Sequence, residues 1–266
     1  MGTEVEQLMA LANPTAQPNS AERQVSVTQE AEFRSEMTVE LVRSAAQDTD
    51  VVWSARVSTA GEKSIEAVDE DPNASKGLIN FLMKNRHGTP FEHNSMTFLV
   101  SAPIFVFREF HRHRIGWSYN EESGRYRELA PVFYVPSPER KLIQIGKPGH
   151  YEFIDGNVEQ SEIVRAATIS ACKSSYAAYQ HMLDAGVARE IARAVLPVAT
   201  YSTMYATCNA RSLMAFLSLR TKHEDSRFPS YPQREIEMVA EQMEDKFAEL
   251  MPLTYAAFVA NGRVSP

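Results

Sequence analysis

Hydrophobic and polar residues follow regular patterns from residue 37 onward, and these patterns predict a succession of strands and helices. The segments 38–43 and 93–101 alternate polar and apolar residues, as a strand with one buried face does. Apolar residues recur at helical spacing in other segments. The predicted helices cover residues 48–55, 75–86, 103–114, 161–185, 188–195, 210–222 and 233–250. The second half of the chain is therefore predicted to be rich in helices.

Several residues fit the ends of these helices. Asp48 or Asp50 would cap the first helix, and Pro103 suits the first turn of the third. Gly186 suits the end of the longest helix, and Pro197 would stop the short helix that precedes it. These signals support the predicted boundaries.

Two regions differ in composition. Residues 1–36 are rich in Ala, Glu, Gln, Ser and Pro, which predicts a mobile tail or a loosely packed extension. Residues 37–266 contain no repeat and no linker-like stretch. We therefore predict a single domain over 37–266.

Composition and charge narrow the classes of function. Of the 266 residues 44% are hydrophobic, but no stretch approaches the ~18 apolar residues that a membrane span needs. The first residues lack the features of a secretory signal, and Cys172 and Cys208 fit neither a zinc pattern nor a CxxC pair. We therefore expect a cytoplasmic protein with no membrane partner and no metal. The net charge of −7 argues against a protein that coats nucleic acid.

One basic segment stands out on this acidic chain. Residues 108–127 contain five arginines and two histidines, interleaved with Trp117, Tyr119 and Tyr126. Arginine matches phosphate with its planar fork, and aromatic rings offer faces on which a base or a flavin can stack. Ser123-Gly124 supplies backbone N–H groups that a phosphate can approach closely. The segment therefore favours a nucleotide-phosphate site.

A plainer interpretation of the same charges is also open. Arginine clusters are often solvated or paired with carboxylates, and Glu109, Glu121 and Glu122 lie nearby. The cluster follows an apolar helix and runs directly into a polar, glycine-containing turn. That position favours the ligand site.

The same residues resemble the signature of a known enzyme family. Arg112-His113-Arg114, Ser118-Tyr119-Asn120-Glu121 and Ser123-Gly124-Arg125-Tyr126 are similar to the motif of the flavin-dependent thymidylate synthases. Further similar blocks occur in the family's order. They are Ala55–Ser58, His87–His93, Pro136–Arg140, Ala192–Pro197 and Asn209–Leu213. Together the blocks cover most of residues 37–262.

The resemblance implies a fold, an assembly and a reaction. It implies a mixed α/β subunit whose central mixed or antiparallel sheet is flanked by helices, assembled as a homotetramer with active sites between subunits. It implies conversion of deoxyuridylate (dUMP) to thymidylate, with methylenetetrahydrofolate as carbon donor and a hydride from reduced FAD, which NADPH regenerates. The family uses no cysteine nucleophile, which fits our interpretation of Cys172 and Cys208 as core residues.

The resemblance also implies roles for individual residues. Arg220 would polarise the uracil ring as the catalytic cation. The residues expected around FAD are Ser58, His87, Thr89, Arg112, His113, Arg114, Glu121, Asn209, Arg211 and Tyr231. Those expected around dUMP are Glu109, Arg112, Glu121, Glu122, Ser123, Gly124, Arg125, Arg193 and Arg220.

Structural roles compete with some of these assignments. Asn209 fits a helix cap as well as it fits a flavin contact, and Arg220 would be favourable in the last turn of a helix without any ligand. His87, taken alone, is more often structural. Arg193 differs, because it lies in an apolar run that would not bury an unpaired charge.

Four features depart from the family pattern. Eight residues separate Arg114 from Ser123, where seven are usual. Glu109 stands where many relatives have glutamine, Ala215 where asparagine is frequent, and Tyr231 where the family has a histidine near the flavin. These departures bear on the flavin contacts more than on the reaction.

Two other functions fit the motif less well. A flavin- and folate-dependent methyltransferase acting on uridine in RNA needs a wide basic surface, which the net acidity disfavours. The other is a nucleotide sensor without activity that has kept the pocket; loss of Ser123, Arg125 or Arg193 would indicate such a protein, and all three are present. We therefore predict an enzyme that acts on a free nucleotide.

Overall fold

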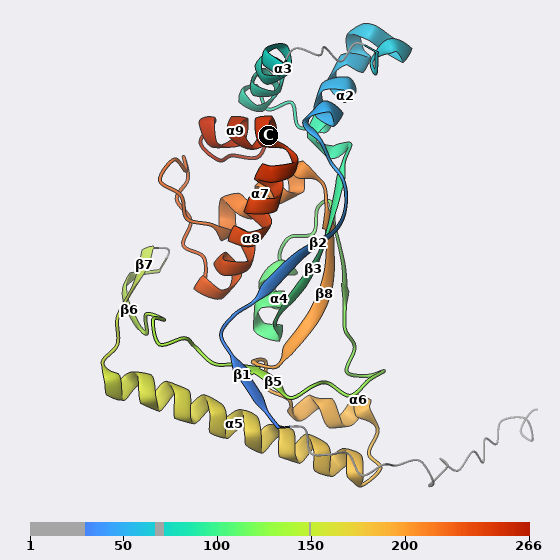
Figure 1. Ribbon diagram of the computed structural model, residues 1–266. Helices are drawn as coiled ribbons and strands as arrows, with labels where there is room; N and C mark the ends of the chain where they lie inside the picture. Colours follow the sequence, from blue (N-terminus) through green and yellow to red (C-terminus); the bar gives the residue numbers. More distant parts are fainter. Residues whose placement is uncertain (1–29, 67–71, 149) are drawn as a thin grey trace, which may run out of the picture. The chain divides into compact units, whose positions relative to one another are not determined.

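A four-stranded antiparallel sheet lies at the centre of the unit Ala31–Pro266 in the computed structural model (Figure 1). The structure describes residues 30–66, 72–148 and 150–266. The strand order is β2-β3-β8-β4, with β2 at Thr38–Ala45, β3 at Ser95–Pro103, β8 at Tyr201–Cys208 and β4 at Trp117–Glu121. The two predicted strands correspond to β2 and β3. The α/β architecture with a helix-flanked antiparallel sheet is confirmed.

Strand pairing decides which face of the sheet is buried. In β3 the residues Met96, Phe98 and Val100 point to one face, as the alternation predicts, and all three are fully buried. They pair with Cys208, Ala206 and Met204 of β8, which point to the same face. Thr97, Leu99 and Ser101 point to the opposite face and are only partly buried. The core therefore lies on one side of the sheet.

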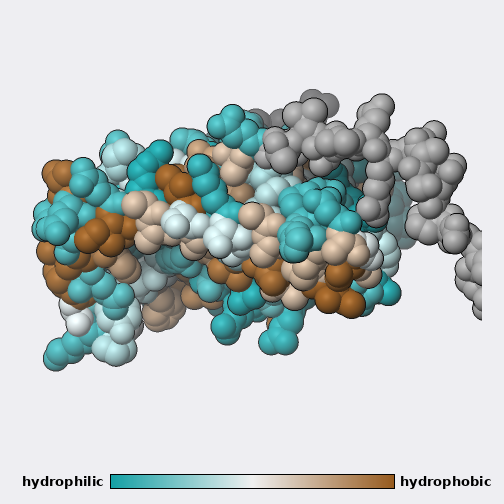
Figure 2. All heavy atoms as spheres, turned by 90° about the horizontal axis from the view of Figure 1, so that it is seen from below, coloured by the Kyte–Doolittle hydropathy of each residue, from teal (hydrophilic) through white to brown (hydrophobic). Residues whose placement is uncertain are grey.

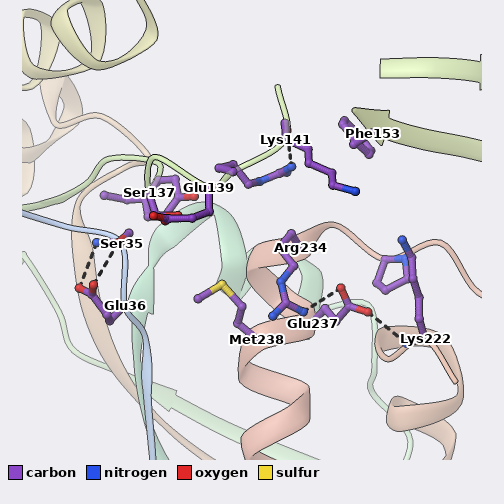
Figure 3. Close-up of a pocket in the computed structure, with 13 residues that line it drawn as sticks. Ser35, Glu36, Ser137, Glu139, Lys141, Phe153, Lys222, Arg234, Glu237 and Met238 are labelled. Atoms are coloured by element: carbon purple, nitrogen blue, oxygen red, sulfur yellow. Dashed lines mark hydrogen bonds and ion pairs between the residues drawn. The ribbon is translucent and has the colours of Figure 1, made fainter. Parts of the chain in front are cut away.

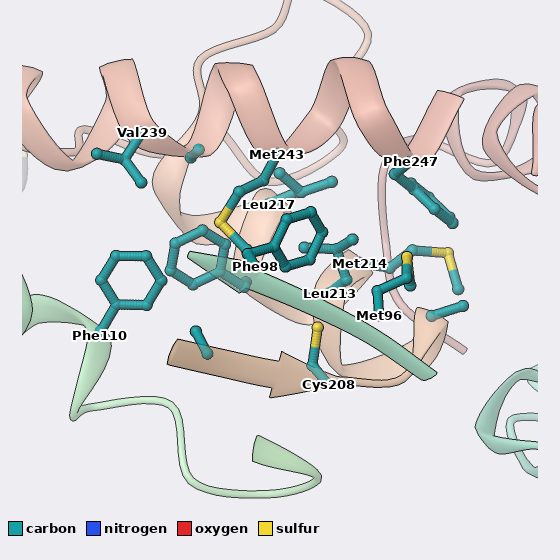
Figure 4. Close-up of a cluster of buried hydrophobic side chains, with 14 of the residues drawn as sticks. Met96, Phe98, Phe110, Cys208, Leu213, Met214, Leu217, Val239, Met243 and Phe247 are labelled. Atoms are coloured by element: carbon teal, nitrogen blue, oxygen red, sulfur yellow. The ribbon is translucent and has the colours of Figure 1, made fainter. Parts of the chain in front are cut away.

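In the described ranges, six helices contribute side chains to the core on that face: α2 (Asp48–Ala60), α3 (Pro72–Lys84), α4 (Ile104–Phe110), α7 (Ala210–Arg220), α8 (Arg234–Leu250) and α9 (Pro252–Ala260). The described residues also form the helices α5 (Val158–Asp184) and α6 (Arg189–Ala192) and the short 3-10 turns η1 (Gly61–Lys63), η2 (Thr89–Glu92) and η3 (Arg193–Val195). Figure 4 shows how Leu213 and Leu217 of α7 and Met243 of α8 pack against Phe98. Burial of these side chains stabilises the fold by roughly 1.5–3 kcal/mol each.

The start of α2 corrects one predicted cap. The N-cap residue is Gln47, whose N–H donates to Asp50 Oδ2 at 2.8 Å, so Asp50 completes the cap rather than forming it. Asp48 has another role. Its carboxylate accepts hydrogen bonds from the backbone N–H groups of Leu253 and Thr254, in the first turn of α9. Asp48 therefore caps a helix that lies about 200 residues later in the chain.

A second, smaller assembly surrounds the long helix α5. Strand β1 (Glu32–Arg34) pairs in parallel with β5 (Val132–Tyr134), and the ring of Tyr176 on α5 packs edge-on against Phe133. Strands β6 (Ile143–Lys147) and β7 (His150–Ile154) form an antiparallel pair before α5 begins. Residues 31–36, which we assigned to the N-terminal extension, thus contribute a paired strand. The rest of that extension, residues 1–29, lies outside the described residues.

Much of α5 faces solvent. Among its 27 residues only Cys172 and Tyr179 are buried, whereas Val158 and Ile163 are exposed. Figure 2 views the molecule from the side of α5 and shows apolar areas alternating with hydrophilic ones. Neither α5 nor any other helix in the described ranges is sufficiently long and apolar to span a membrane.

Candidate active site

The basic motif follows α4 and is held by one tyrosine. Tyr119 of β4 donates its hydroxyl to the carbonyl oxygens of Phe110 (3.0 Å) and His113 (2.7 Å). These bonds fasten the turn after α4 against the sheet, so the helix ends at Phe110 instead of the predicted Arg114. Arg112 and Arg114 are consequently exposed on this turn, where a ligand can reach them.

Three predicted residues meet at the end of α7, and we call them the Arg220 cluster. Arg220 Nη1 lies 2.8 Å from Glu109 Oε2, and its Nε donates to His113 Nε2 at 3.0 Å. The Arg220 side chain is 16% exposed and that of Glu109 is 30% exposed. Two partners therefore fix the guanidinium while part of it stays accessible.

The same contacts define the protonation state of His113. Arginine donates only, so Nε2 of His113 must be the acceptor and the ring must be neutral. Burial, followed by the charge of Arg220, lowers the pKa of His113 to about 4. The family motif thus holds an uncharged histidine between charged arginines.

We expect an NMR titration to give His113 a pKa of about 4, compared with 6.5 for an ordinary histidine. Both burial and the positive charge of Arg220 disfavour the imidazolium form. In Arg220→Gln the pKa should rise but stay below 6.5, because burial is the larger cause. A wild-type value near 6.5 would contradict the contact.

A second group, the phosphate turn, consists of Ser123–Arg125 and Arg193. The chain leaves β4 and turns, with the N–H of Tyr126 donating to Ser123 O at 3.0 Å. Gly124 is buried in this turn. A Cβ on Gly124 would lie 3.0 Å from Leu129 Cδ1, a tight contact, and 3.4 Å from Arg193 Cδ, an ordinary one, so Gly124 packs closely on Leu129 with Arg193 beside it. The turn therefore places the hydroxyl of Ser123 and two arginines together.

Carboxylates balance the arginines around this turn. Arg125 Nε lies 3.1 Å from Glu190 Oε2 of α6, and Arg127 Nε lies 3.1 Å from Glu122 Oε1. Glu122 therefore has an arginine partner within its own segment. The pair between Arg125 and Glu190 is more than half exposed, so a phosphate can replace the carboxylate at little cost.

A third group, the Arg211 cluster, forms where α7 begins. Arg211 Nη1 pairs with Glu92 Oε1, and Arg211 Nε donates to Pro266 O at 2.7 Å. A Cβ on Gly88 would lie 2.5 Å from Arg211 Cζ, so the guanidinium packs directly on the Gly88 backbone. The blocks His87–His93 and Asn209–Leu213 are thereby brought together.

Other predicted flavin residues surround this cluster or have local partners. Asn209 Oδ1 accepts from Ser212 N at 2.9 Å, which confirms the helix-cap interpretation of Asn209. The His87 ring stacks on Phe81 at 5.9 Å, and Thr89 opens η2. Ser58 is exposed on α2, and its hydroxyl donates to Ala55 O.

The family model described as "Thymidylate synthase complementing protein" matches residues 40–253. A flavin-dependent thymidylate synthase of Streptomyces coelicolor is 68% identical over 235 residues, which cover 88% of this chain and 96% of that protein. The chain belongs to the flavin-dependent thymidylate synthase family. A member from Tropheryma whipplei is 56% identical over 234 residues, covering 88% of this chain and 97% of that protein.

Solved structures extend the similarity to the fold. A UMP/dUMP methylase, PolB from Streptomyces cacaoi bound with 5-Br dUMP, superposes with a TM-score of 0.83 at 57% identity. The match covers 88% of this chain and all of that one. The same methylase bound with 5-Br UMP gives a TM-score of 0.81 at 56% identity, covering 89% and 99% of the two chains. At this identity and TM-score the two chains share the same fold.

The flavin-dependent thymidylate synthase motif is divided among the three groups in this chain. Arg220, Glu109 and His113 lie at the end of α7, Arg211 lies at its start, and Gly124 lies beyond β4. Within the described part of the chain, no hydrogen bond or ion pair joins a residue of one group to a residue of another. A single subunit therefore presents three separate groups of candidate residues.

Tyr231, which stands where the family has a histidine, contacts residues that belong to none of the three groups. Its hydroxyl lies 3.2 Å from His150 Nδ1 of β7, and it lines a hollow of about 330 Å³ with Lys222 and His223. Lys222 also borders a cavity of about 520 Å³ below Phe153 (Figure 3). Basic side chains of this cavity are Arg140, Lys141, Lys222 and Arg234, and its carboxylates are Glu36, Glu139 and Glu237. The charges of the cavity are therefore mixed.

Both cysteines are core residues. Cys172 and Cys208 are buried and unpaired, and burial raises the pKa of both thiols, as expected for core residues. In the described ranges, His, Cys, Asp and Glu side chains form no group of three that could hold a metal ion.

The sequence did not predict that Glu92 and Pro266 are the partners of Arg211. Gly88, in the same sequence block as Glu92, was the one indication, because a glycine allows another side chain to pack directly on its backbone.

Proposed function

We propose that the protein converts dUMP to thymidylate as a flavin-dependent thymidylate synthase, with FAD, methylenetetrahydrofolate and NADPH. Overall, dUMP, methylenetetrahydrofolate, NADPH and a proton give thymidylate, tetrahydrofolate and NADP⁺. The observation that carries the proposal is the Arg220 cluster. It holds one cation rigidly beside the exposed Arg112 and Arg114, in a family whose named members make thymidylate.

The residues present fit a flavin dinucleotide. Its pyrophosphate is an anion, and Arg211 offers a cation that packs on glycine and keeps 43% of its side chain exposed. Arg112 and Arg114 are exposed as well, and His87 presents a ring at the surface. Bound FAD would supply the hydride chemistry. Arg112, His113, Arg114 and Arg211 would hold it, with Ser58, Thr89, Glu121, Asn209 and Tyr231 around it.

Arg220 would act on the uracil ring. Attack of the uracil C5 on the carbon donor requires an electron-rich ring, and a guanidinium fixed near a ring carbonyl would stabilise the negative charge that develops on that oxygen as the ring is activated. Glu109 and His113 hold Arg220 before the substrate arrives, so little reorganisation is needed. Because His113 is neutral, it orients Arg220 without adding a second positive charge that would repel it.

The phosphate turn would bind the nucleotide phosphate. Ser123 offers a hydroxyl, Gly124 a backbone N–H, and Arg125 and Arg193 two cations. Arg125 would exchange its exposed partner Glu190 for the phosphate. Glu121 and Glu122 would border the same ligand, with the charge of Glu122 balanced by Arg127.

A homotetramer would join groups from different subunits. The Arg220 cluster and the phosphate turn both belong to the expected dUMP site, and no hydrogen bond or ion pair in the described residues links them within the subunit. Exposed apolar side chains on and near α5 and α6 provide a surface for self-association, and they include Ile154, Val158, Ile163, Ile191 and Val195. Subunit contacts there would bring groups from different protomers together.

We expect purified protein with FAD, NADPH, methylenetetrahydrofolate and dUMP to form thymidylate, detected by mass spectrometry of the nucleotides. Omission of any component should abolish the product, and Arg112→Ala should abolish it too. A flavin-loaded tetramer without product would overturn the proposal.

UMP is a second candidate substrate, because the similar methylase PolB is named for UMP and dUMP and was solved with both 5-bromo analogues. The same assay with UMP therefore measures the ratio of kcat/KM for the two nucleotides. Faster methylation of UMP would move the proposal from thymidylate synthesis to ribonucleotide methylation. Turnover of uridine in RNA would instead favour the RNA methyltransferase.

A further inference from the structure

Residues 263–266 contact both ends of α7, and we call them the 263–266 segment. At the start of α7, Ser265 Oγ donates to Arg211 O at 2.9 Å, and Arg211 Nε donates to Pro266 O at 2.7 Å. The backbone and the side chain of Arg211 are thus both held. The segment also accepts a hydrogen bond at Val264 O from Arg86 Nη1.

At the other end of α7 the contact is made by Arg263. Its side chain is completely buried, with Nη1 and Nη2 paired to the carboxylate of Glu244 on α8. Nη2 also donates to Thr221 Oγ1 at 2.7 Å. Thr221 directly follows Arg220, and Ser230 Oγ holds its carbonyl at 2.7 Å. Arg263 therefore holds the side chain of the residue next to Arg220, and Ser230 holds its backbone carbonyl.

Backbone strain is concentrated at the same place. In the described ranges, the residues other than glycine with a positive φ are Arg86 (64°) and Arg263 (54°). Such a conformation is costly for a side chain with a Cβ and persists only where surrounding contacts require it. Both strained arginines touch the 263–266 segment or belong to it. Both positive-φ arginines thus lie just after the end of a helix, α3 and α9, at points where the 263–266 segment is anchored.

The contacts orient Arg211 without blocking it. Nε donates a hydrogen bond to Pro266 O, Nη1 pairs with the carboxylate of Glu92, and the flat face of the guanidinium packs on Gly88. These partners leave the Nη2 edge for a ligand. A free arginine side chain would lose rotational freedom on binding a pyrophosphate, whereas Arg211 is already confined.

We propose that the 263–266 segment is a positioning element that sets Arg211 for the flavin and Arg220 for the nucleotide through the two ends of α7. The inference rests on the proposed function, because it assumes that these arginines meet FAD and dUMP. It assigns the segment a role in affinity and turnover in addition to stability.

The first test compares FAD binding in full-length wild type and in a variant lacking Ser265 and Pro266. We expect the Kd for FAD, from quenching of flavin fluorescence, to rise about tenfold, because Arg211 loses a charge-assisted hydrogen bond. Gly88→Ala should give a similar rise, since its Cβ displaces the guanidinium. Ser218→Ala is the matched control, because that hydroxyl bonds only within α7.

The second test concerns Arg220. Arg263 is buried with a charged partner, so its variants are prone to unfolding, and Thr221 is the better target. Thr221→Val should lower kcat several-fold with dUMP saturating, and Thr221→Ser should restore it, because serine keeps the acceptor oxygen for Arg263.

Two outcomes would overturn the inference. One is an FAD Kd within twofold of wild type in both the deletion and Gly88→Ala. The other is an equal loss of kcat in Thr221→Val and Thr221→Ser, which would indicate a merely structural role. A wild-type protein that binds no FAD would instead overturn the proposed function, so the two failures are distinguishable.

Discussion

Arg220→Lys should lower kcat about a hundredfold while dUMP still binds. The guanidinium contacts Glu109 and His113 at once and still presents a cation, whereas a lysine has a single ammonium and cannot keep both partners. Loss of one preorganised charge-stabilising donor typically costs about 10²–10³ in kcat. The measurement is thymidylate formation with dUMP saturating.

Arg43→Lys on the exposed part of β2 is the matched control and should leave turnover unchanged. Direct binding of dUMP, measured by calorimetry, separates the two roles of Arg220. Full turnover by Arg220→Lys would show that the cation does not polarise the ring. A loss confined to dUMP affinity would make Arg220 a binding residue.

The second large effect is expected on stability, at the buried pair of Arg140 and Glu235. Arg140 Nε lies 2.8 Å from Glu235 Oε1, and Tyr134 Oη donates to the same oxygen at 2.7 Å. Only 4% of the Glu235 side chain is exposed. Arg140→Met should therefore lower the free energy of unfolding by about 3–5 kcal/mol, because it leaves Glu235 buried without its cation.

Urea unfolding measures this effect, and Glu241→Gln provides its control. Glu241 pairs with Arg234 at 2.7 Å on the surface, where such a pair contributes less than about 1 kcal/mol. The double variant Arg140→Met/Glu235→Leu should recover most of the loss, since no buried charge then remains unpaired. Equal effects of Arg140→Met and Glu241→Gln would contradict the burial argument.

The same pair predicts a pH dependence. Burial raises the pKa of Glu235, but hydrogen bonds from Arg140 and Tyr134 outweigh it and hold the pKa below the ordinary 4.5. A carboxyl with a depressed pKa in the folded state stabilises the protein fully above its unfolded pKa. This contribution should therefore be present above about pH 4.5 and be lost as the pH falls through the folded-state pKa. It should be absent from the double variant.

The spacing of apolar residues in the sequence predicted helices and strands that have one apolar and one polar face. It missed β8 and α9, whose faces differ less in polarity. Strand β3 and helix α8 each bury one apolar face, so their alternation and spacing are clear in the sequence. Strand β8 buries the small residues Ser202 and Ala206 as well as Met204. Its alternation of apolar and polar residues is therefore weak in the sequence. Helix α9 is apolar on almost all sides, so it shows no period.

The resemblance to the family motif indicated which residues form the candidate site. The structure showed that these residues fall into three groups. The motif blocks indicated which residues to consider, but not that Arg220 meets Glu109 and His113 while Arg193 lies beside Gly124. Contacts such as Arg211 with Pro266 join residues 55 positions apart and follow no local rule. Long-range partners of this kind depend on the whole fold.

The strand order has a consequence for how the protein is made. β3 and β4 never pair with each other, because β8, nearly eighty residues later in the chain, lies between them. A nascent chain that has left the ribosome only as far as residue 200 therefore has β3 paired with β2 on one edge alone, and β4 without any partner in this sheet. Such edges are templates for pairing with other chains. Folding of the sheet must wait for β8, and newly made subunits are most prone to aggregation during that interval.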